Sequence, residues 1–444
     1  NAAADERIVD AQPCAPRPSS SAAPIEYIFK SDRLELNMGL KRFPVKVPCY
    51  GRHGTVSGTV LVKDFKAVTK VTITLEGGCY TSVMERGMAV YNSTKTLLLK
   101  TQVLWTRPES ATCSPEAPST FPFSFPLPTY IQGSDIRLPH SYATIHPGLN
   151  GDVTYQVRVD LYRKGLRRHE RYVTNSVLSP LTRSADSPSS RLKTMILYLP
   201  RSTPTDWIPQ PSDDTETTRD FLSWETVPIL PRHSQALAKA KRASQIVDEK
   251  PLGDQINLIL PLPKTYASYA PIPFHVSLPA ESPLLPHIST GLSVHLIKYT
   301  IIRAGGFISM KEGIIGTGEI WRIEDHSYPT PPPSPGGEDE ERTLATPRKV
   351  YSGTLKSFRE GGESSWNIPE YLEIKYSIRL RLRAPGQDGK HIPDYYVDHP
   401  ITMCTHNYIP NADDIHDPVI GLIAVSGSQG APTGHNAGLV NSVQ

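Results

Sequence analysis

The chain has 444 residues, a formal net charge of +3, 38% hydrophobic residues and 20% charged residues. This length accommodates two or three domains with ample cores, and so small a net charge does not require a nucleic acid or an anionic membrane as partner. The 43 prolines are about twice the average usage of about 5%. So many prolines exclude a mostly helical chain and favour short strands joined by loops.

Cysteine usage and the distribution of apolar residues indicate the compartment. The five cysteines are odd in number, widely spaced and never in a C-x-x-C pair: Cys14, Cys49, Cys79, Cys113 and Cys404. We therefore expect neither a disulfide framework nor a zinc module, and a reducing cytosol is the natural compartment. The first residues have no apolar core, and the longest apolar runs, such as 419–425, are far shorter than the about 20 residues of a membrane span. We expect no transmembrane segment.

Strand signals dominate the first part of the chain. Residues 1–23 are rich in Ala, Pro and Ser and are expected to form a disordered tail. Short runs separated by turn residues then predict an immunoglobulin-like β-sandwich over 24–183. The expected strands are 25–29, 33–38, 55–65, 70–80, 94–105, 121–128, 152–162 and 171–178.

Residues 121–162 carry the clearest pattern. One face of the strand 153–162 is expected to be core: Val153, Tyr155, Val157, Val159 and Leu161. The preceding segment also alternates, with Phe121, Phe123, Phe125 and Leu127 on one side. Prolines at 122, 126 and 128 lack the backbone N–H of a ladder donor, so this segment is expected to be an edge strand.

These residues also carry a family resemblance. The order "FPFSFPLP", then "LPHSY", then "GDVTYQVRVDLY" resembles the end of an arrestin N-terminal domain, and "CYGRHGTVSGTVLV" and "KVTITLEG" resemble its opening strands. The resemblance covers residues 43–178 and is to the α-arrestin family, of the fungal type. It implies an all-β fold of two arrestin-type β-sandwiches.

A second sandwich is expected over 195–409, after a small, polar connector at 184–194. Two insertions are expected in it, at 201–250 and 325–349, and a disordered tail at 410–444. The first insertion contains a helix candidate at 234–249, whose thin apolar face favours a solvated helix over a membrane anchor. The proline-rich, acidic second insertion is expected to be a disordered loop.

No catalytic constellation is present at the required spacing, so no enzyme activity, cofactor or metal is expected. The best metal candidate is the set His399, Cys404 and His406. A fourth ligand at motif spacing is lacking, so a strand with a buried thiol is the favoured interpretation.

Two basic clusters are candidate binding surfaces for acidic or phosphorylated partners. The first surrounds an expected hairpin turn: Arg163, Lys164, Arg167, Arg168 and Arg171. The second lies on one face of a strand, where Arg379, Arg381 and Arg383 repeat every ~6.8 Å and could grip phosphate or carboxylate groups. For both clusters a solvated outer face is the favoured alternative.

The loop at 325–349 carries three Ser/Thr-Pro sites, Thr330, Ser334 and Thr346, which are candidate phosphosites. The chain has no P-P-x-Y motif, through which many α-arrestins recruit ubiquitin ligases, so any ligase must be recruited by another surface. Readers of phosphorylated Ser/Thr-Pro are an alternative class of partner.

The resemblance implies a non-enzymatic, cytoplasmic adaptor, recruited to the plasma membrane or endosomes, that functions in endocytosis and protein transport. Its expected partners are the cytoplasmic tails of membrane proteins, ubiquitin ligase components or phospho-dependent readers, with a weak phosphoinositide contact as a further candidate. The alternatives that stay open are a structural coat subunit of a sorting complex such as retromer, an enzyme on a sandwich fold, and a purely structural β-sandwich protein.

Overall fold

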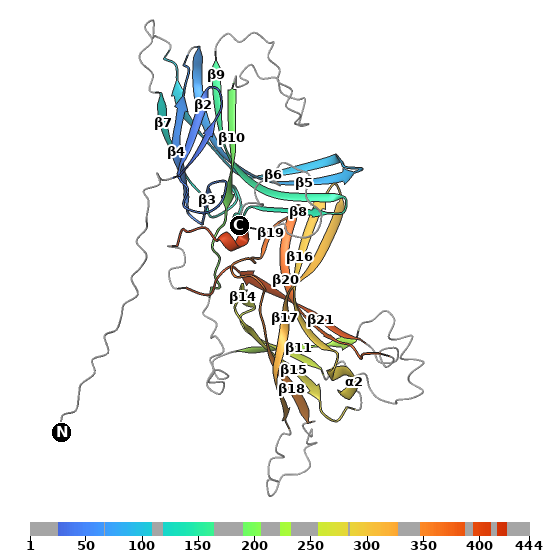
Figure 1. Cartoon of the computed structure of the whole chain (residues 1–444). Coiled ribbons are helices and arrows are strands. Elements are labelled where there is room, and N and C mark those ends of the chain that lie inside the picture. The colour runs from blue at the N-terminus through green and yellow to red at the C-terminus, as the bar shows by residue number, and fades with distance from the viewer. Residues whose placement is uncertain are drawn as a thin grey trace, which may run out of the picture.

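Strands make up nearly all of the regular structure in the computed structural model (Figure 1). The structure describes residues 25–65, 67–108, 119–163, 190–205, 223–231, 256–282, 285–326, 347–386, 394–409 and 415–423. Within these ranges the helical elements are one short α-helix, α2 (Leu285–Ser289), and one 3-10 turn, η4 (Ile420–Leu422). The expected all-β, two-sandwich fold is therefore confirmed. No helix of the described ranges is long and apolar enough to cross a bilayer.

The first sandwich packs a four-stranded sheet against a six-stranded one. The four-stranded sheet has the order β1-β2-β4-β7, with bounds β1 Glu26–Lys30, β2 Leu34–Leu40, β4 Thr55–Val62 and β7 Thr120–Pro126. The six-stranded sheet has the order β3-β10-β9-β5-β6, and β8 pairs with β9 beside this path. Its bounds are β3 Cys49–Tyr50, β5 Val68–Glu85, β6 Met88–Thr106, β8 Tyr142–His146, β9 Leu149–Arg163 and β10 Ser190–Tyr198.

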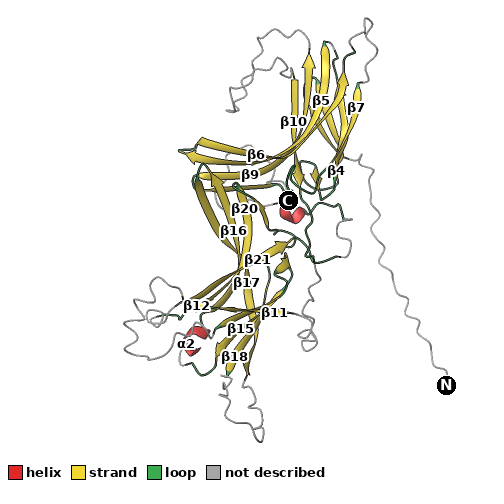
Figure 2. Ribbon diagram, turned by 180° about the vertical axis from the view of Figure 1, so that it is seen from behind, coloured by secondary structure: helices red, strands yellow, loops and turns green. Residues whose placement is uncertain are grey.

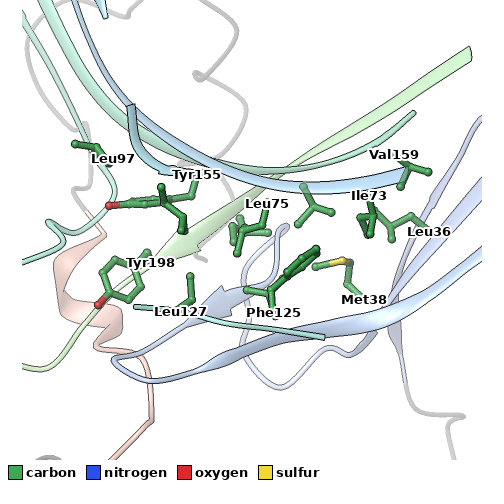
Figure 3. Packing of buried hydrophobic residues seen from close by; sticks show 14 of the residues in the cluster. Leu36, Met38, Ile73, Leu75, Leu97, Phe125, Leu127, Tyr155, Val159 and Tyr198 are labelled. Atoms are coloured by element: carbon green, nitrogen blue, oxygen red, sulfur yellow. The ribbon is translucent and has the colours of Figure 1, made fainter. Parts of the chain in front are cut away.

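The register expected for residues 121–162 is confirmed. The five alternating residues predicted from Val153 to Leu161 are all buried, and Tyr155 lies beside Leu75, Leu97 and Tyr198 (Figure 3). Phe121, Phe123, Phe125 and Leu127 are buried on the opposing sheet. As expected from its prolines, β7 is an edge strand, because it ends the order of the four-stranded sheet.

The second sandwich is one hydrogen-bonded sheet that folds into two layers. The strand order is β11-β13-β15-β18-β17-β16-β20-β21-β12, with β14 beside β21 and β19 beside β20. The long strand β17 joins the layers, because Phe307–Thr317 pairs with β16 while Gly318–His326 pairs with β18. The bounds are β11 Trp224–Pro228, β12 Leu230–Pro231, β13 Asn257–Pro261, β14 Thr265–Ala267, β15 Ile272–Pro279, β16 Leu292–Ala304, β17 Phe307–His326, β18 Arg348–Leu355, β19 Trp366–Ile368, β20 Leu372–Leu382 and β21 Tyr395–Cys404.

The long strands of the first sandwich extend over the second. In both views β5, β6 and β9 bend away from the first sandwich and lie across the end of β16 and β20 (Figures 1 and 2). Ile302, Ala304, Ile368 and Leu372 of the second sandwich therefore belong to the hydrophobic core of the first. This shared core fixes the junction between the two sandwiches.

The boundary between the domains differs from the prediction. Residues 190–198 form β10, which pairs antiparallel with β9 and so belongs to the first sandwich, not to a connector or the second domain. The reason is that Ile196 and Tyr198 fill the first core. Residues 223–231, expected inside an insertion, form β11 and β12 of the second sandwich.

The expected disordered tail at 410–444 is wrong for residues 415–423, which return to the first sandwich. Val419 N–H donates to Leu199 O at 2.9 Å, and Val419 and Leu422 are buried against Leu199. A Cβ at Gly51 would lie 2.3 Å from the His416 carbonyl oxygen, so this approach requires glycine. The segment is held because its apolar side chains have a place in a small core.

Several predictions fall outside the described residues. These are the tail 1–23, the strand 171–178, the helix 234–249, and most of the loop 325–349 with its three candidate phosphosites. They stay predictions.

Candidate functional site

A cluster of polar side chains fills the junction between the two sandwiches. Lys298 Nζ on β16 lies 2.7 Å from Glu363 Oε2, and the side chains are only 22% and 8% exposed. Tyr376 on β20 donates a hydrogen bond to the same Glu363 oxygen at 2.7 Å. Burial by itself lowers the pKa of Lys298, but the neighbouring Tyr142 and Glu363 raise it above its ordinary value, so the lysine stays charged.

The first sandwich contributes the "LPHSY" segment to this cluster. The ring of Tyr142 lies 5.7 Å from Lys298 Nζ, and its hydroxyl is 3.4 Å from Thr300 Oγ1. His140 Nε2 accepts a hydrogen bond from Trp366 Nε1 on β19 at 2.9 Å, and His140 Nδ1 lies 2.9 Å from Ser141 O. Because a carbonyl only accepts, His140 carries its proton on Nδ1 and is neutral in this arrangement.

We expect the junction to weaken at acidic pH because of His140. Burial lowers the pKa of His140 from 6.5 to about 4. The unfolded chain therefore binds this proton more readily than the folded chain, so the stability contributed above pH 6.5 is lost as the pH falls toward 4. The loss should reach about 3 kcal/mol at pH 4.

Denaturant unfolding of wild type and His140→Gln, followed from neutral pH down to pH 4, measures this contribution. The glutamine side chain keeps one donor and one acceptor but does not titrate. The stability difference between the two proteins should shrink as the pH falls. A difference that is independent of pH would show that His140 is accessible to protons in the folded state.

The arginine face predicted on β20 is confirmed in its geometry. Ile378, Leu380 and Leu382 are buried, while the three arginines point to the other side. Acidic side chains of neighbouring strands already meet these arginines. Arg379 contacts Asp398 at 2.8 Å and Glu312 at 2.9 Å, and Arg381 contacts Asp394 at 2.9 Å, whereas Arg383 is 3.8 Å from Asp394.

Asp398 is the centre of this second cluster. Burial by itself raises its pKa, but hydrogen bonds from Arg379, Tyr396 and Tyr299 lower it below the ordinary value. An incoming phosphate would have to displace these carboxylates from Arg379. The arrangement therefore favours a structural role for Arg379, while anion binding by Arg381 and Arg383 stays a prediction.

Of the first basic cluster, the structure places only Arg163, at the end of β9. Its guanidinium lies 3.1 Å from Asp64 Oδ2. Lys164, Arg167, Arg168 and Arg171 lie outside the described residues. Their binding role stays a prediction.

The residues considered as metal ligands have separate neighbours. His399 Nε2 faces Glu225 Oε2 at 3.3 Å, and His406 Nδ1 lies 2.9 Å from Thr405 Oγ1. Cys404 is buried, which raises the pKa of its thiol to about 11 and keeps it protonated. In the part of the chain that the structure describes, no three His, Cys, Asp or Glu side chains are grouped to hold a metal ion.

Three hairpin turns next to the junction expose large apolar side chains. The turns are Arg86–Gly87 between β5 and β6, Pro147–Gly148 between β8 and β9, and Gly305–Gly306 between β16 and β17. We call the exposed residues beside them the hairpin-tip surface: Met88, Val90, Tyr91, Ile145, Phe307, Ile308 and Met310. Sequence reasoning missed this surface. A signal was present, because "GMAV" and "GGFISM" place apolar residues next to one another, whereas a strand with one buried face alternates apolar and polar residues.

The first sandwich also has a free strand edge. β1 ends the order of the four-stranded sheet, and no other strand of the described ranges pairs with its outer side. Unlike β7, it contains no proline, and Ile28 is 42% exposed on it. Such an edge can accept one more strand.

The fold and the junction define a class of protein: two β-sandwiches held together by a shared core and by polar contacts of His140 and Tyr142 with the second sandwich. No family model matches the chain, and no curated protein matches it. What the chain does is therefore inferred from its own residues.

Proposed function

We propose that this protein is a non-enzymatic, arrestin-like adaptor in the cytoplasm that binds the cytoplasmic tails of membrane proteins, or the trafficking and ubiquitination machinery that acts on them. The segments that carry the resemblance have connected places in the fold, which supports the proposal. Residues 121–127 include the edge strand β7, "LPHSY" reaches the junction, and β9 forms the centre of the first core.

The observation that carries the proposal is the free edge of β1. An extended peptide that adds to this edge gains main-chain hydrogen bonds, while side chains such as Ile28 supply specificity. β1 also lies beside β10, on which Lys193 is exposed and able to attract an acidic or phosphorylated tail. The candidate phosphosites Thr330, Ser334 and Thr346 would regulate the adaptor through phosphate charge.

A pull-down from cell lysate, with and without phosphatase treatment, tests the adaptor role. We expect wild type to retain membrane proteins or ubiquitin ligase components, and Ile28→Asp to lose them, because a charge on the edge strand opposes strand addition. Ile320→Asp is the matched control, since Ile320 is similarly exposed but lies on β17 in the second sandwich.

Other outcomes would point to other functions. Recovery of a fixed, stoichiometric complex would favour the coat-subunit alternative. Equal cargo recovery by wild type and Ile28→Asp would exclude the β1 edge as the binding site.

A further inference from the structure

The hairpin-tip surface is built from three turns that support one another. Met84 N–H next to the first turn donates to Gly148 O in the second at 2.8 Å. His146 Nδ1 lies 2.9 Å from Ser309 Oγ on β17, so the second turn contacts the third. A Cβ at Gly305 would lie 3.0 Å from the ring of Tyr91, which places the third turn against β6. The three tips therefore form one rigid projection.

Both views show this projection at one side of the molecule, where the ends of β5, β6 and β9 meet the end of β16 (Figures 1 and 2). Its seven apolar side chains are between 46% and 70% exposed. Exposed apolar residues that occur singly need no explanation, but a contiguous group of this kind marks an interaction surface.

Both faces of one hairpin are exposed, and this favours a lipid bilayer over a protein as the partner. Neighbouring residues of a strand point to opposite faces, so the exposure of both Phe307 (61%) and Ile308 (70%) means that both faces of this hairpin end are open. A flat protein surface covers one face of a hairpin, whereas the interfacial region of a bilayer surrounds both.

The polar residues of the tips fit the same partner. Arg86 and Lys311 flank the apolar side chains on two of the hairpins, and Tyr91 has the amphipathic ring that favours the headgroup level. Glu85 balances Arg86, and Glu312 contacts Arg379. Lys311 is then the one positive charge left, so binding would depend on apolar insertion more than on electrostatic attraction.

We propose that the hairpin-tip surface inserts into the headgroup and upper acyl region of a lipid bilayer. Insertion is limited to this depth because the backbone groups of the turns must stay hydrated. This inference goes beyond the adaptor role, since it requires no cargo, and it would hold the β1 edge near a membrane without occupying it.

Flotation of the full chain with protein-free phosphatidylcholine vesicles tests the proposal. We expect wild type to float with the vesicles, and Phe307→Ser and Ile308→Asp each to weaken binding by about tenfold or more, because each removes a large apolar side chain from the inserted set. Phe358→Ser is the matched control for Phe307→Ser: Phe358 is 65% exposed but follows β18 and is hydrogen-bonded to Ile315 of β17, outside the three turns. It should bind vesicles as wild type does.

The outcomes separate lipid binding from the adaptor role. Ile28→Asp should lose cargo and keep vesicle binding. Ile308→Asp should lose vesicle binding and keep cargo in lysate without membranes. The proposal is overturned if wild type does not float, or if the tip variants float as well as wild type. It is also overturned if only membranes that carry proteins are bound and protease treatment abolishes that binding, because the surface would then dock on protein.

Discussion

Val157→Asp is expected to abolish the cooperative unfolding transition of the first sandwich. Val157 is fully buried on β9, between β5 and β10, where it pairs with Leu75 and Thr194. A carboxylate placed there has no cation to pair with, and burying an unpaired charge costs several kcal/mol, which is comparable with the whole stability of a domain of about 5–15 kcal/mol. Thermal unfolding followed by circular dichroism measures the effect.

Thr154→Asp is the control on the same strand. Thr154 points to the opposite face and is only partly buried, so its replacement should cost about 1 kcal/mol or less. If both variants melted like wild type, the register of β9 described above would be incorrect.

Glu363→Gln is expected to cost about 3–5 kcal/mol of folding free energy, because it leaves the ammonium of Lys298 mostly buried without its counter-charge. The amide keeps the shape of the carboxylate and can still accept the hydrogen bond from Tyr376. The loss therefore reports the missing charge and not a cavity. Denaturant titration gives the change directly.

Two further variants separate this effect from a general sensitivity to charge. Lys298→Met combined with Glu363→Gln should recover most of the loss, since replacing both members of a buried pair is often neutral. Glu35→Gln breaks the exposed pair of Lys30 and Glu35, which lie 3.4 Å apart, and should cost less than about 1 kcal/mol. Equal effects of Glu363→Gln and Glu35→Gln would mean that the junction pair is solvated.

The strands with strict alternation could be predicted from the sequence. In β9 and β20 the choice of buried face follows from a period of two and needs no knowledge of the neighbours. The edge position of β7 followed from its prolines, which is a local property. The same reasoning put the small, polar run 184–194 in a connector, but its last residues begin β10. The buried side of β10 follows only from its long-range pairing with β9, which local sequence does not show.

The junction could not be predicted because its members are far apart in the chain. Lys298 lies on the inward face of β16, in phase with the buried Val294 and Leu296, where the sequence pattern alone predicts an apolar residue. Its partners come from distant parts of the chain: Glu363 from the loop before β19, and Tyr142 from the first sandwich, 156 positions away. The arginine face of β20 illustrates the opposite case: its direction was predictable, but the carboxylates of Asp398 and Glu312 that neutralise Arg379 come from other strands.

The return of residues 415–423 to the first sandwich has a mechanical consequence. The chain passes from the first sandwich to the second near Ser202 and comes back near Thr405, and these two passages are bonded side by side, with Thr405 N–H donating to Ser202 Oγ at 3.0 Å. The second sandwich is thus a closed loop inserted into the first. A pulling force applied between residues 25 and 423 would load the first sandwich and the Ser202–Thr405 clasp, while the second sandwich stays out of the load path.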